Sequence, residues 1–211
     1  MSPRWLDGLQ SILDTAQTAA WLAHEGLVPD PMLEDRVAVF EAMARTAESS
    51  PGRTVYLEFG VYRGDSLRWW SSRLTSADTR LFGFDTFSGV DAPWTWQTHM
   101  ADFDVAGHVP QIDDARVEFV EGLFADSLPG FELPDRDRLI VVVDSDIYSS
   151  ATTVLTWLAP RIRSGDLIYF DEFKFFHDER RAFAEFRDAT GRRCSVLAAA
   201  EGLRSVAFVA T

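Results

Sequence analysis

The spacing of apolar residues changes near residue 50 of the chain. Before it, Leu6, Leu9 and Leu13 recur at helical intervals, and a second helix is predicted to begin at Asp30-Pro31. After it come short apolar runs of the kind that form strands buried on both faces of a sheet. These runs are Val55–Phe59, Leu81–Asp85, Val117–Val120, Leu139–Asp144 and Leu167–Asp171.

Three helical patterns lie between these runs, at Asp65–Leu74, Ser149–Leu158 and Asp178–Thr190. This alternation is typical of a doubly wound parallel sheet. The tail differs, because Cys194–Ala199 and Leu203–Ala210 flank a tight turn and predict an antiparallel hairpin. We therefore expect an α/β, Rossmann-like fold with N-terminal helices and a mostly parallel seven-stranded sheet that closes in this hairpin. Residues 1–50 would form a helical lid or dimerisation segment on a compact catalytic unit, residues 51–211.

The length and the net charge of the chain make some classes of function and partner less favourable. The 211 residues suffice for one good core, and 33 acidic against 20 basic residues give a formal net charge of −13. Nucleic acid is a disfavoured partner because phosphate binding needs a basic face. The N-terminal run does not resemble a signal peptide, and no apolar stretch is long enough to cross a bilayer. The single cysteine, Cys194, fits a reducing compartment, so we expect a cytoplasmic protein without a membrane partner.

A loop with two glycines follows the first predicted strand and opens the next helix. It contains Glu58, Gly60, Tyr62, Gly64 and Ser66. Glycines here let the backbone turn sharply and let a ligand approach it closely, although a tight turn alone would also use them. Glu58 would repel a pyrophosphate but attract the α-ammonium of a methionine group. The loop therefore favours S-adenosylmethionine over NAD, with these five residues as candidate contacts.

Asp85 ends the second predicted strand and is followed by Thr86. About twenty residues after a glycine loop, an acidic side chain can accept hydrogen bonds from both ribose hydroxyls of an adenosine. An aspartate at a strand end could instead cap the following helix. We favour ribose binding by Asp85, with Thr86 beside it.

Carboxylates end two further predicted strands, Asp144 on one and Asp171 and Glu172 on the other. Adjacent parallel strands would bring the three together, where like charges repel one another. A hard divalent cation relieves that repulsion, and oxygen ligands suit Mg²⁺ better than zinc. The alternative is that both aspartates cap helices and Glu172 faces solvent. We favour a metal site that could chelate a vicinal diol and lower the pKa of one hydroxyl.

The connection at residues 90–114 is long and has no helical pattern. Long connections at the ligand-binding edge of such sheets are usually functional or disordered. Trp94, Trp96 and His99 favour a loop that covers the substrate over one that only packs on the sheet. His99 is the candidate general base, with His177 and Asp146 as further candidates.

These motifs together resemble the macrocin O-methyltransferase family of class I, metal-dependent sugar O-methyltransferases. The resemblance rests on residues 58–64, 84–89, 121–129, 144–148 and 171–173. It implies a class I methyltransferase fold, with S-adenosylmethionine and magnesium as cofactors. It also implies a role for each matching position. In the cofactor site, Glu58, Gly60 and Gly64 would line the methionine group, Asp85 would hold the ribose, and Gly122 and Leu123 would border the adenine. In the metal site, Asp144, Asp171 and Glu172 would ligate the ion, with Asp144 between metal and cofactor.

The sequence thus predicts an O-methyltransferase whose catalytic residues are Asp144 and His99. Its acceptor would be a small hydroxylated natural product, such as the sugar of an antibiotic or another diol. Two alternatives stay open: a nucleotide-binding or dinucleotide-binding Rossmann oxidoreductase, and a non-catalytic protein that binds S-adenosylmethionine. The N-terminal helices could serve as a lid or as the interface of a homodimer.

Overall fold

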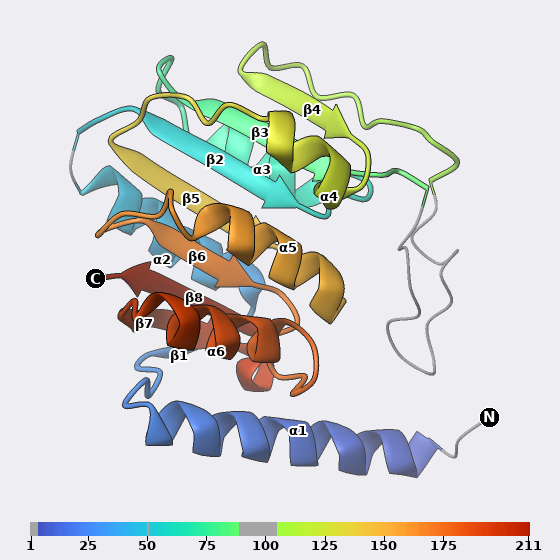
Figure 1. The fold of residues 1–211 in the computed structure, drawn as a ribbon, viewed down its shortest axis with the longest axis vertical. Coiled ribbons are helices and arrows are strands. Elements are labelled where there is room, and N and C mark those ends of the chain that lie inside the picture. Colours follow the sequence, from blue (N-terminus) through green and yellow to red (C-terminus); the bar gives the residue numbers. More distant parts are fainter. Residues whose placement is uncertain (1–3, 50, 89–104) are drawn as a thin grey trace.

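A computed structural model describes residues 4–49, 51–88 and 105–211 of the chain. Its centre is one eight-stranded sheet with the strand order β1-β7-β8-β6-β5-β2-β3-β4 (Figure 1). All neighbouring strands are parallel except β8, which runs antiparallel to both β6 and β7. The expected mostly parallel sheet with an antiparallel C-terminal hairpin is therefore confirmed.

The strands follow the apolar runs closely. They are β2 (Thr54–Phe59), β3 (Arg80–Asp85), β4 (Val117–Glu121), β5 (Arg138–Val143), β6 (Leu167–Phe170), β7 (Cys194–Ala200) and β8 (Ser205–Ala210). Between β7 and β8 the chain makes a single 3-10 turn, η3 (Glu201–Leu203). The sequence missed the eighth strand, β1 (Met32–Leu33), which pairs with the edge strand β7.

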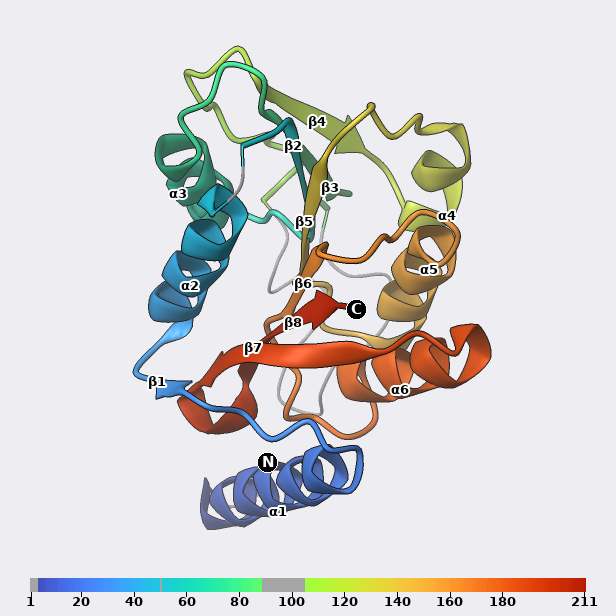
Figure 2. The same cartoon turned by 90° about the vertical axis from the view of Figure 1, so that its left-hand side faces the viewer.

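Helices cover both faces of the sheet. Figure 2 shows α2 (Arg36–Glu48) and α3 (Asp65–Arg73) on one side and the remaining sheet-covering helices on the other. Those are α4 (Phe124–Ser127) with the adjoining 3-10 turn η2 (Leu128–Gly130), α5 (Tyr148–Leu158) and α6 (Glu179–Thr190). The long helix α1 (Arg4–His24) lies beyond the β1–β7 edge of the sheet.

The predicted start of the second helix at Asp30-Pro31 is wrong. Asp30 and Pro31 lie in a bend, and the strand β1 that follows aligns Met32 with Ala199 and Leu33 with Ala200 of β7. The helix begins at Arg36, after an N-cap at Asp35 whose carboxylate accepts the Ala38 amide at 2.9 Å. Hydrogen bonding to an open sheet edge thus outweighs a helix-start pattern that is favourable only locally.

The central strands are buried along their whole length, as expected for parallel strands covered on both faces. On the α2 side, Phe40 packs against Tyr169 of β6 and Trp70 of α3, with ring centroids 4.8 Å and 5.3 Å apart. On the other side, Phe183 of α6 packs against Phe208 at 4.4 Å. Because α2 contributes directly to this core, it is integral to the sheet's packing; the division of the chain at residue 50 stays a prediction.

Strand register sets where the site lies. Phe59 of β2 aligns with Val143 of β5, and Val143 aligns with Phe170 of β6. The residues that follow these strand ends therefore emerge side by side, and the loops approach each other so closely that only glycine fits at one position. A Cβ on Gly60 would lie 1.8 Å from the Asp144 carbonyl oxygen, and the φ of Gly60 is +94°.

We expect Gly60→Ala to lower the free energy of unfolding by about 3 kcal/mol or more, because it adds a clash with backbone to an unfavourable φ. Gly165→Ala is the matched control, since Gly165 has a similar φ of +88° but open space around its Cβ position. That change should lower stability by only about 1–2 kcal/mol. Urea unfolding of both variants measures the difference, and equal losses would contradict the assigned close approach.

Candidate functional site

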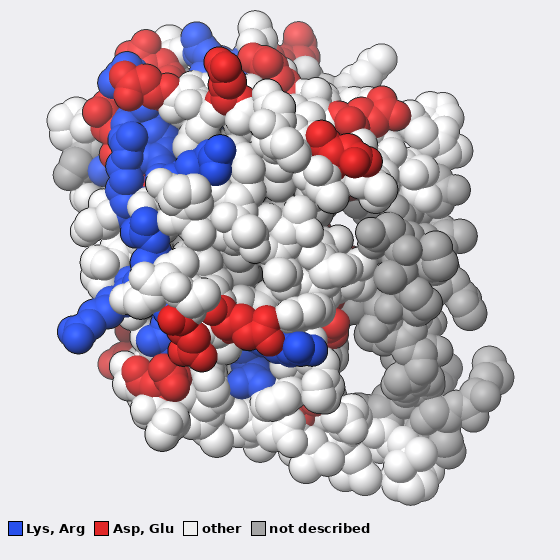
Figure 3. Space-filling view, viewed as in Figure 1, with Lys and Arg blue, Asp and Glu red and all other residues white. Residues whose placement is uncertain are grey.

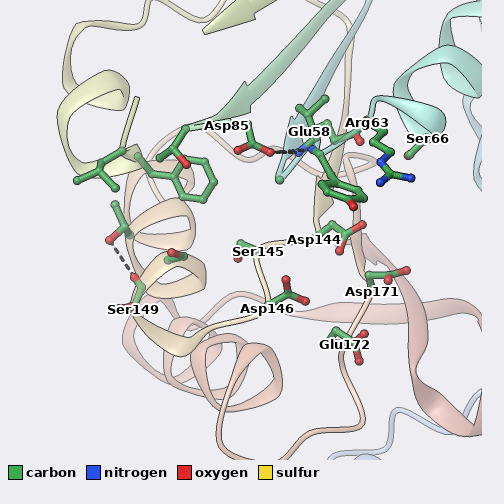
Figure 4. Close-up of a pocket in the computed structure, with 18 of the residues that line it drawn as sticks. Glu58, Arg63, Ser66, Asp85, Asp144, Ser145, Asp146, Ser149, Asp171 and Glu172 are labelled. Atoms are coloured by element: carbon green, nitrogen blue, oxygen red, sulfur yellow. Dashed lines mark hydrogen bonds between the residues drawn. The ribbon is translucent and has the colours of Figure 1, made fainter. Parts of the chain in front are cut away.

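A cavity of about 330 Å³ opens at the carboxyl ends of β2, β3, β5 and β6. This is where ligands bind in open α/β sheets, and the volume lies within the range of about 300–1,000 Å³ of small-molecule sites. Figure 4 shows Glu58 and Asp85 at one part of the cavity and Asp144, Asp146, Asp171 and Glu172 at another. Of the predicted site residues, those that line the cavity are Glu58, Gly60, Tyr62, Ser66, Asp85, Thr86, Leu123, Asp144, Asp171 and Glu172.

Glu58 is fully buried near the end of β2. The Tyr56 hydroxyl donates a hydrogen bond to its Oε2 at 2.5 Å. Burial raises the pKa of Glu58 to about 8, and the Tyr56 hydrogen bond and the Arg36 guanidinium only partly oppose that rise. This carboxyl is therefore mostly protonated at neutral pH, and a bound cation would favour its ionised form.

The glycines of the loop differ in what they do. Gly60 lines the cavity and allows the close approach to Asp144. Gly64, in contrast, lies outside the lining: it is the N-cap of α3 with a φ of +77°, and a Cβ there would meet Pro110 at 3.0 Å. Gly122 is also outside the lining, and its amide donates to the Asp85 carbonyl at 3.0 Å. Gly64 and Gly122 thus contact other residues of the protein rather than the cavity itself.

Asp85 holds the glycine loop in place. Its Oδ2 accepts the backbone amides of Val61 and Tyr62 at 2.7 Å and 2.8 Å, and its Oδ1 accepts the Phe87 amide at 2.8 Å. Helix capping, the alternative considered from the sequence, is therefore not its structural role. Asp85 nevertheless lines the cavity, so its remaining lone pairs can face a ligand.

The far wall of the cavity comes from α4 and α5. Leu123, just before α4, lines it together with Phe124, while α5 contributes the hydroxyl-bearing Ser149 and Thr153. Leu123 is 42% exposed, so an apolar surface is available to a flat ring there. The position is the one that the sequence assigned to the adenine border.

Carboxyl groups crowd the other part of the cavity. Burial, followed by the charges of Asp171 and Asp146, raises the pKa of Asp144 well above its ordinary value. Burial and neighbouring carboxylates likewise raise the pKa of Asp146 to about 8. Burial also raises the pKa of Glu172 to about 7, although Arg204 opposes the shift. The raised pKa values agree with the prediction that these side chains lie near one another and repel one another.

Two arginines that the sequence did not single out lie among these carboxylates. Arg36, the first residue of α2, has its Nη1 3.8 Å from Asp144 Oδ2 and 3.6 Å from Asp171 Oδ1. Arg204, after η3, donates from Nε to Glu172 Oε1 at 2.8 Å. Neither belongs to a motif, because one opens a helix and the other follows a hairpin turn. Only the folded chain brings them to the strand ends.

Glu179 is a further residue of the site that the sequence did not reveal. It is fully buried at the start of α6, where it accepts the Ser145 amide at 3.2 Å and the Glu172 amide at 2.9 Å. One side chain therefore ties together the loops after β5 and β6. Burial raises its pKa well above the ordinary value. An acidic residue at the start of a predicted helix is a recognisable feature of the sequence. The sequence does not show, however, that its side chain would accept hydrogen bonds from two separate loops.

The chemistry of these donors suits a hard divalent cation, but their arrangement is not a finished metal site. Among the described residues, no three acidic, histidine or cysteine side chains are placed to hold one ion. The Tyr169 hydroxyl donates to Asp171, and the two arginines pair with the carboxylates. However, Glu172 Oε2 is buried and accepts no hydrogen bond from the part of the chain that is described. The donor set thus fits a cation in charge and in oxygen chemistry, provided that the arginines move.

Several predicted features fall outside the described residues. His99, Trp94 and Trp96 lie in the segment 89–104, so the covering loop and its candidate base stay predictions. Residues 105–114 are described and contain no helix, as the sequence indicated. The other candidate base, His177, does not line the cavity, whereas Asp146 does.

The comparison with known families settles where the chain belongs. A family model described as Macrocin-O-methyltransferase (TylF) matches residues 34–197, well over half of the chain. The chain belongs to the macrocin O-methyltransferase family. The resemblance inferred from its motifs is thereby confirmed.

Individual proteins to which the chain is similar share less than a third of its residues in the aligned regions. The 8-demethyl-8-(2,3-dimethoxy-α-L-rhamnosyl)-tetracenomycin-C 4'-O-methyltransferase of Streptomyces olivaceus is 29% identical over 148 residues, which is 60% of this chain and 55% of that protein. The chain thus spans about half the length of this curated relative. The O-methyltransferase NovP superposes with a TM-score of 0.61 at 20% identity, covering 82% of this chain and 79% of NovP. A structure described as cmcI-D160 Mg-SAM gives 0.56 at 19% identity, covering 85% and 73%. These superpositions confirm the class I, Rossmann-like fold.

Basic and acidic side chains lie at separate places on the surface of the protein. On the face in Figure 3, Lys and Arg gather in a band along one side, while Asp and Glu lie in several separate groups. In the described part of the chain, no helix combines the length and the apolar character that a membrane span requires. The cytoplasmic location and the absence of a nucleic-acid partner stay predictions.

Ionisation of Glu58 should destabilise the folded protein at high pH. Its pKa is about 8 in the folded chain, against an ordinary value of 4.5, so the stability present below pH 4.5 is lost as pH rises toward 8. Glu58→Gln removes that ionisation and should raise the free energy of unfolding at pH 8 by on the order of 3 kcal/mol, with little effect at pH 4.5. Urea unfolding across this pH range measures it.

The control for this experiment is Glu132→Gln, since Glu132 is exposed and outside the cavity lining. It should follow the wild-type pH profile. If Glu58→Gln also followed that profile, Glu58 would not carry the buried protonation described above.

Proposed function

We propose that this chain is an S-adenosylmethionine-dependent, magnesium-assisted O-methyltransferase that acts on a hydroxyl of a small natural product. The observation that carries the proposal is one cavity with two acidic parts, one at Glu58 and Asp85 and the other at the carboxylates after β5 and β6. Family membership supports the reaction type. The name of the Streptomyces olivaceus relative supports a sugar hydroxyl as the acceptor.

The first part suits S-adenosylmethionine. Glu58, in its ionised form, would pair with the α-ammonium of the methionine group, and the loop from Gly60 to Ser66 would border that group. Asp85 would accept the ribose hydroxyls with Thr86 beside it, while Leu123 would contact the adenine. Each of these side chains lines the cavity. Gly64 and Gly122 would act indirectly, by shaping the walls.

The second part suits Mg²⁺. Asp144, Asp171 and Glu172 would hold the ion, with Arg36 and Arg204 displaced from the positions described above. The buried, unpaired Oε2 of Glu172 and the raised pKa values of the cluster support this assignment. The neighbour described as a Mg-SAM structure supports it by analogy of fold. When bound, such an ion supplies a positive charge that stabilises an acceptor oxygen as it loses its proton.

Methyl transfer from a sulfonium is an in-line displacement in which the acceptor oxygen attacks the methyl carbon as the carbon–sulfur bond breaks. The chain would contribute mainly alignment: the glycine loop and Asp85 would fix the cofactor, and Asp144 would position the metal ion beside it. The hydroxyl proton must pass to a base, and Asp146, which lines the cavity beside the proposed metal ligands, is one candidate. His99 is a further candidate base. S-adenosylhomocysteine is the product that leaves.

The two alternatives predict different ligands. An oxidoreductase should bind NAD, which the acidic Glu58 at the glycine loop disfavours. A non-catalytic protein should bind S-adenosylmethionine without transferring its methyl group. Retention of carboxylates at all of the proposed metal positions favours an enzyme.

Calorimetric titration with S-adenosylhomocysteine tests the cofactor assignment. We expect it to bind and NAD not to bind. Because the ligand's ammonium favours ionised Glu58, affinity should rise by up to about tenfold per pH unit between pH 6 and pH 8. Glu58→Gln should weaken binding and remove this pH dependence, whereas Glu132→Gln should change neither.

Transfer of a labelled methyl group from S-adenosylmethionine to a rhamnosylated polyketide tests the reaction. We expect labelled product in the presence of Mg²⁺ and a loss of at least about 100-fold in rate for Asp144→Asn. Binding of NAD in place of S-adenosylhomocysteine would refute the proposal. Cofactor binding without transfer to any hydroxylated acceptor would favour the non-catalytic alternative.

A further inference from the structure

The outward face of α1 is apolar along the whole helix. Trp5, Leu9 and Ile12 are 65%, 51% and 67% exposed, and Leu6 and Leu13 are 41% and 54% exposed. The exposed alanines at positions 16, 19, 20 and 23 continue the same face. At 100° per residue these positions fall within an arc of about 140°, which we call the apolar stripe of α1.

The inward face of α1 is polar from Ser11 to Thr18, whereas Trp21 and Leu22 in its last turn pack in the core of the domain. Thr15 Oγ1 donates to the Gly202 carbonyl at 3.2 Å, and Thr18 Oγ1 donates to the Lys174 carbonyl at 2.8 Å. Lys174 Nζ donates to Ser11 Oγ at 3.1 Å. A helix that buries an apolar stripe in its own domain would show the opposite pattern. Before Trp21, the amphipathicity of α1 is therefore directed away from its own domain.

Large and small side chains occupy opposite halves of the apolar stripe. The large ones, from Trp5 to Leu13, precede the middle of the helix at residue 14, and the alanines follow it. Two copies of α1 packed antiparallel about this middle would place Trp5 opposite Ala23, Leu9 opposite Ala19 and Ile12 opposite Ala16. At these three positions, large side chains of each copy would fill the space that the alanines of the other leave open, while Leu6 and Leu13 would flank them. A two-fold pairing requires this kind of self-complementarity.

We propose that α1 is the interface of a homodimer, in which a second copy of this chain packs antiparallel on the apolar stripe. Figures 1 and 2 both place α1 at the margin of the molecule, where a second copy can reach it. None of the cavity-lining residues belongs to α1, so the pairing leaves the cavity open.

The charge of the molecule argues against a lipid surface as the occupant. Interfacial helices that bind anionic membranes carry Lys and Arg along their polar face. The polar face of α1 presents Ser11, Asp14, Thr15 and Thr18 instead, and the chain as a whole has a formal net charge of −13. The part of Figure 3 that shows α1 is mostly free of charged side chains.

Sedimentation equilibrium of the full chain tests the proposal. We expect a dimer for wild type, and a dissociation constant raised by about 100-fold or more for Ile12→Glu, which would bury an unpaired charge at the interface. Gln17→Glu is the matched control: Gln17 is exposed on the same helix but outside the apolar stripe, so its dimer should persist. Far-UV circular dichroism confirms that each variant keeps its helices.

Ala16→Leu separates close helix pairing from unspecific adhesion. A larger side chain opposite Ile12 should weaken the antiparallel dimer, whereas it would strengthen binding to any generic apolar surface. A wild-type chain that stays monomeric at all concentrations would overturn the proposal, as would a dimer that Ile12→Glu leaves intact. Sedimentation of the monomer with phosphatidylcholine–phosphatidylglycerol vesicles would instead identify a lipid occupant. Binding of S-adenosylhomocysteine is measured separately, so failure of the dimer is distinguishable from failure of the proposed function.

Discussion

The burial of like charges at the ends of adjacent parallel strands is the constraint on which the rest of this structure depends. Register places Glu58, Asp144 and Asp171 at one edge of the sheet, where Glu58 and Asp171 are buried and Asp144 is half-buried. Carboxylates in such a place are unfavourable unless they are protonated, paired or bound to a cation. Arg36, Arg204 and two tyrosine hydroxyls meet part of that requirement within the chain. The carboxylate charge that these groups do not compensate gives the cavity an affinity for cations, and an ammonium group or a metal ion can bind there.

Features remote from any ligand follow from the same constraint. Holding carboxylates close requires the loops that carry them to approach one another, and Gly60 permits this where a Cβ would meet the Asp144 carbonyl. Glu179 then fixes the two acidic loops by accepting an amide from each. Asp85 does the same for the glycine loop. Backbone amides thus become part of the support that fixes the loops around the cavity.

Much of this arrangement could be predicted from the sequence, because buried parallel strands leave a clear trace. Runs such as Leu139–Asp144 give both the strand and the carboxylate that ends it, and strand order then brings Asp144 near Asp171. Features that depend on tertiary contacts could not be predicted. Met32 and Leu33 form a strand only because β7 offers an open edge. Arg36 and Arg204 reach the carboxylates from a helix start and a hairpin turn, and no local pattern reveals their partners. Gly64 is required by its contact with Pro110 rather than by a ligand.

The central claim is that cofactor and cation share one cavity, and Mn²⁺ in place of Mg²⁺ tests it most directly. Nuclear magnetic resonance of bound S-adenosylhomocysteine would be recorded while Mn²⁺ is added. We expect strong broadening of the ligand's methylene resonances in wild type, because a paramagnetic ion at Asp144, Asp171 and Glu172 would lie beside them, and loss of that broadening in Asp171→Asn. Bound S-adenosylhomocysteine whose resonances stay sharp at saturating Mn²⁺ would contradict the account.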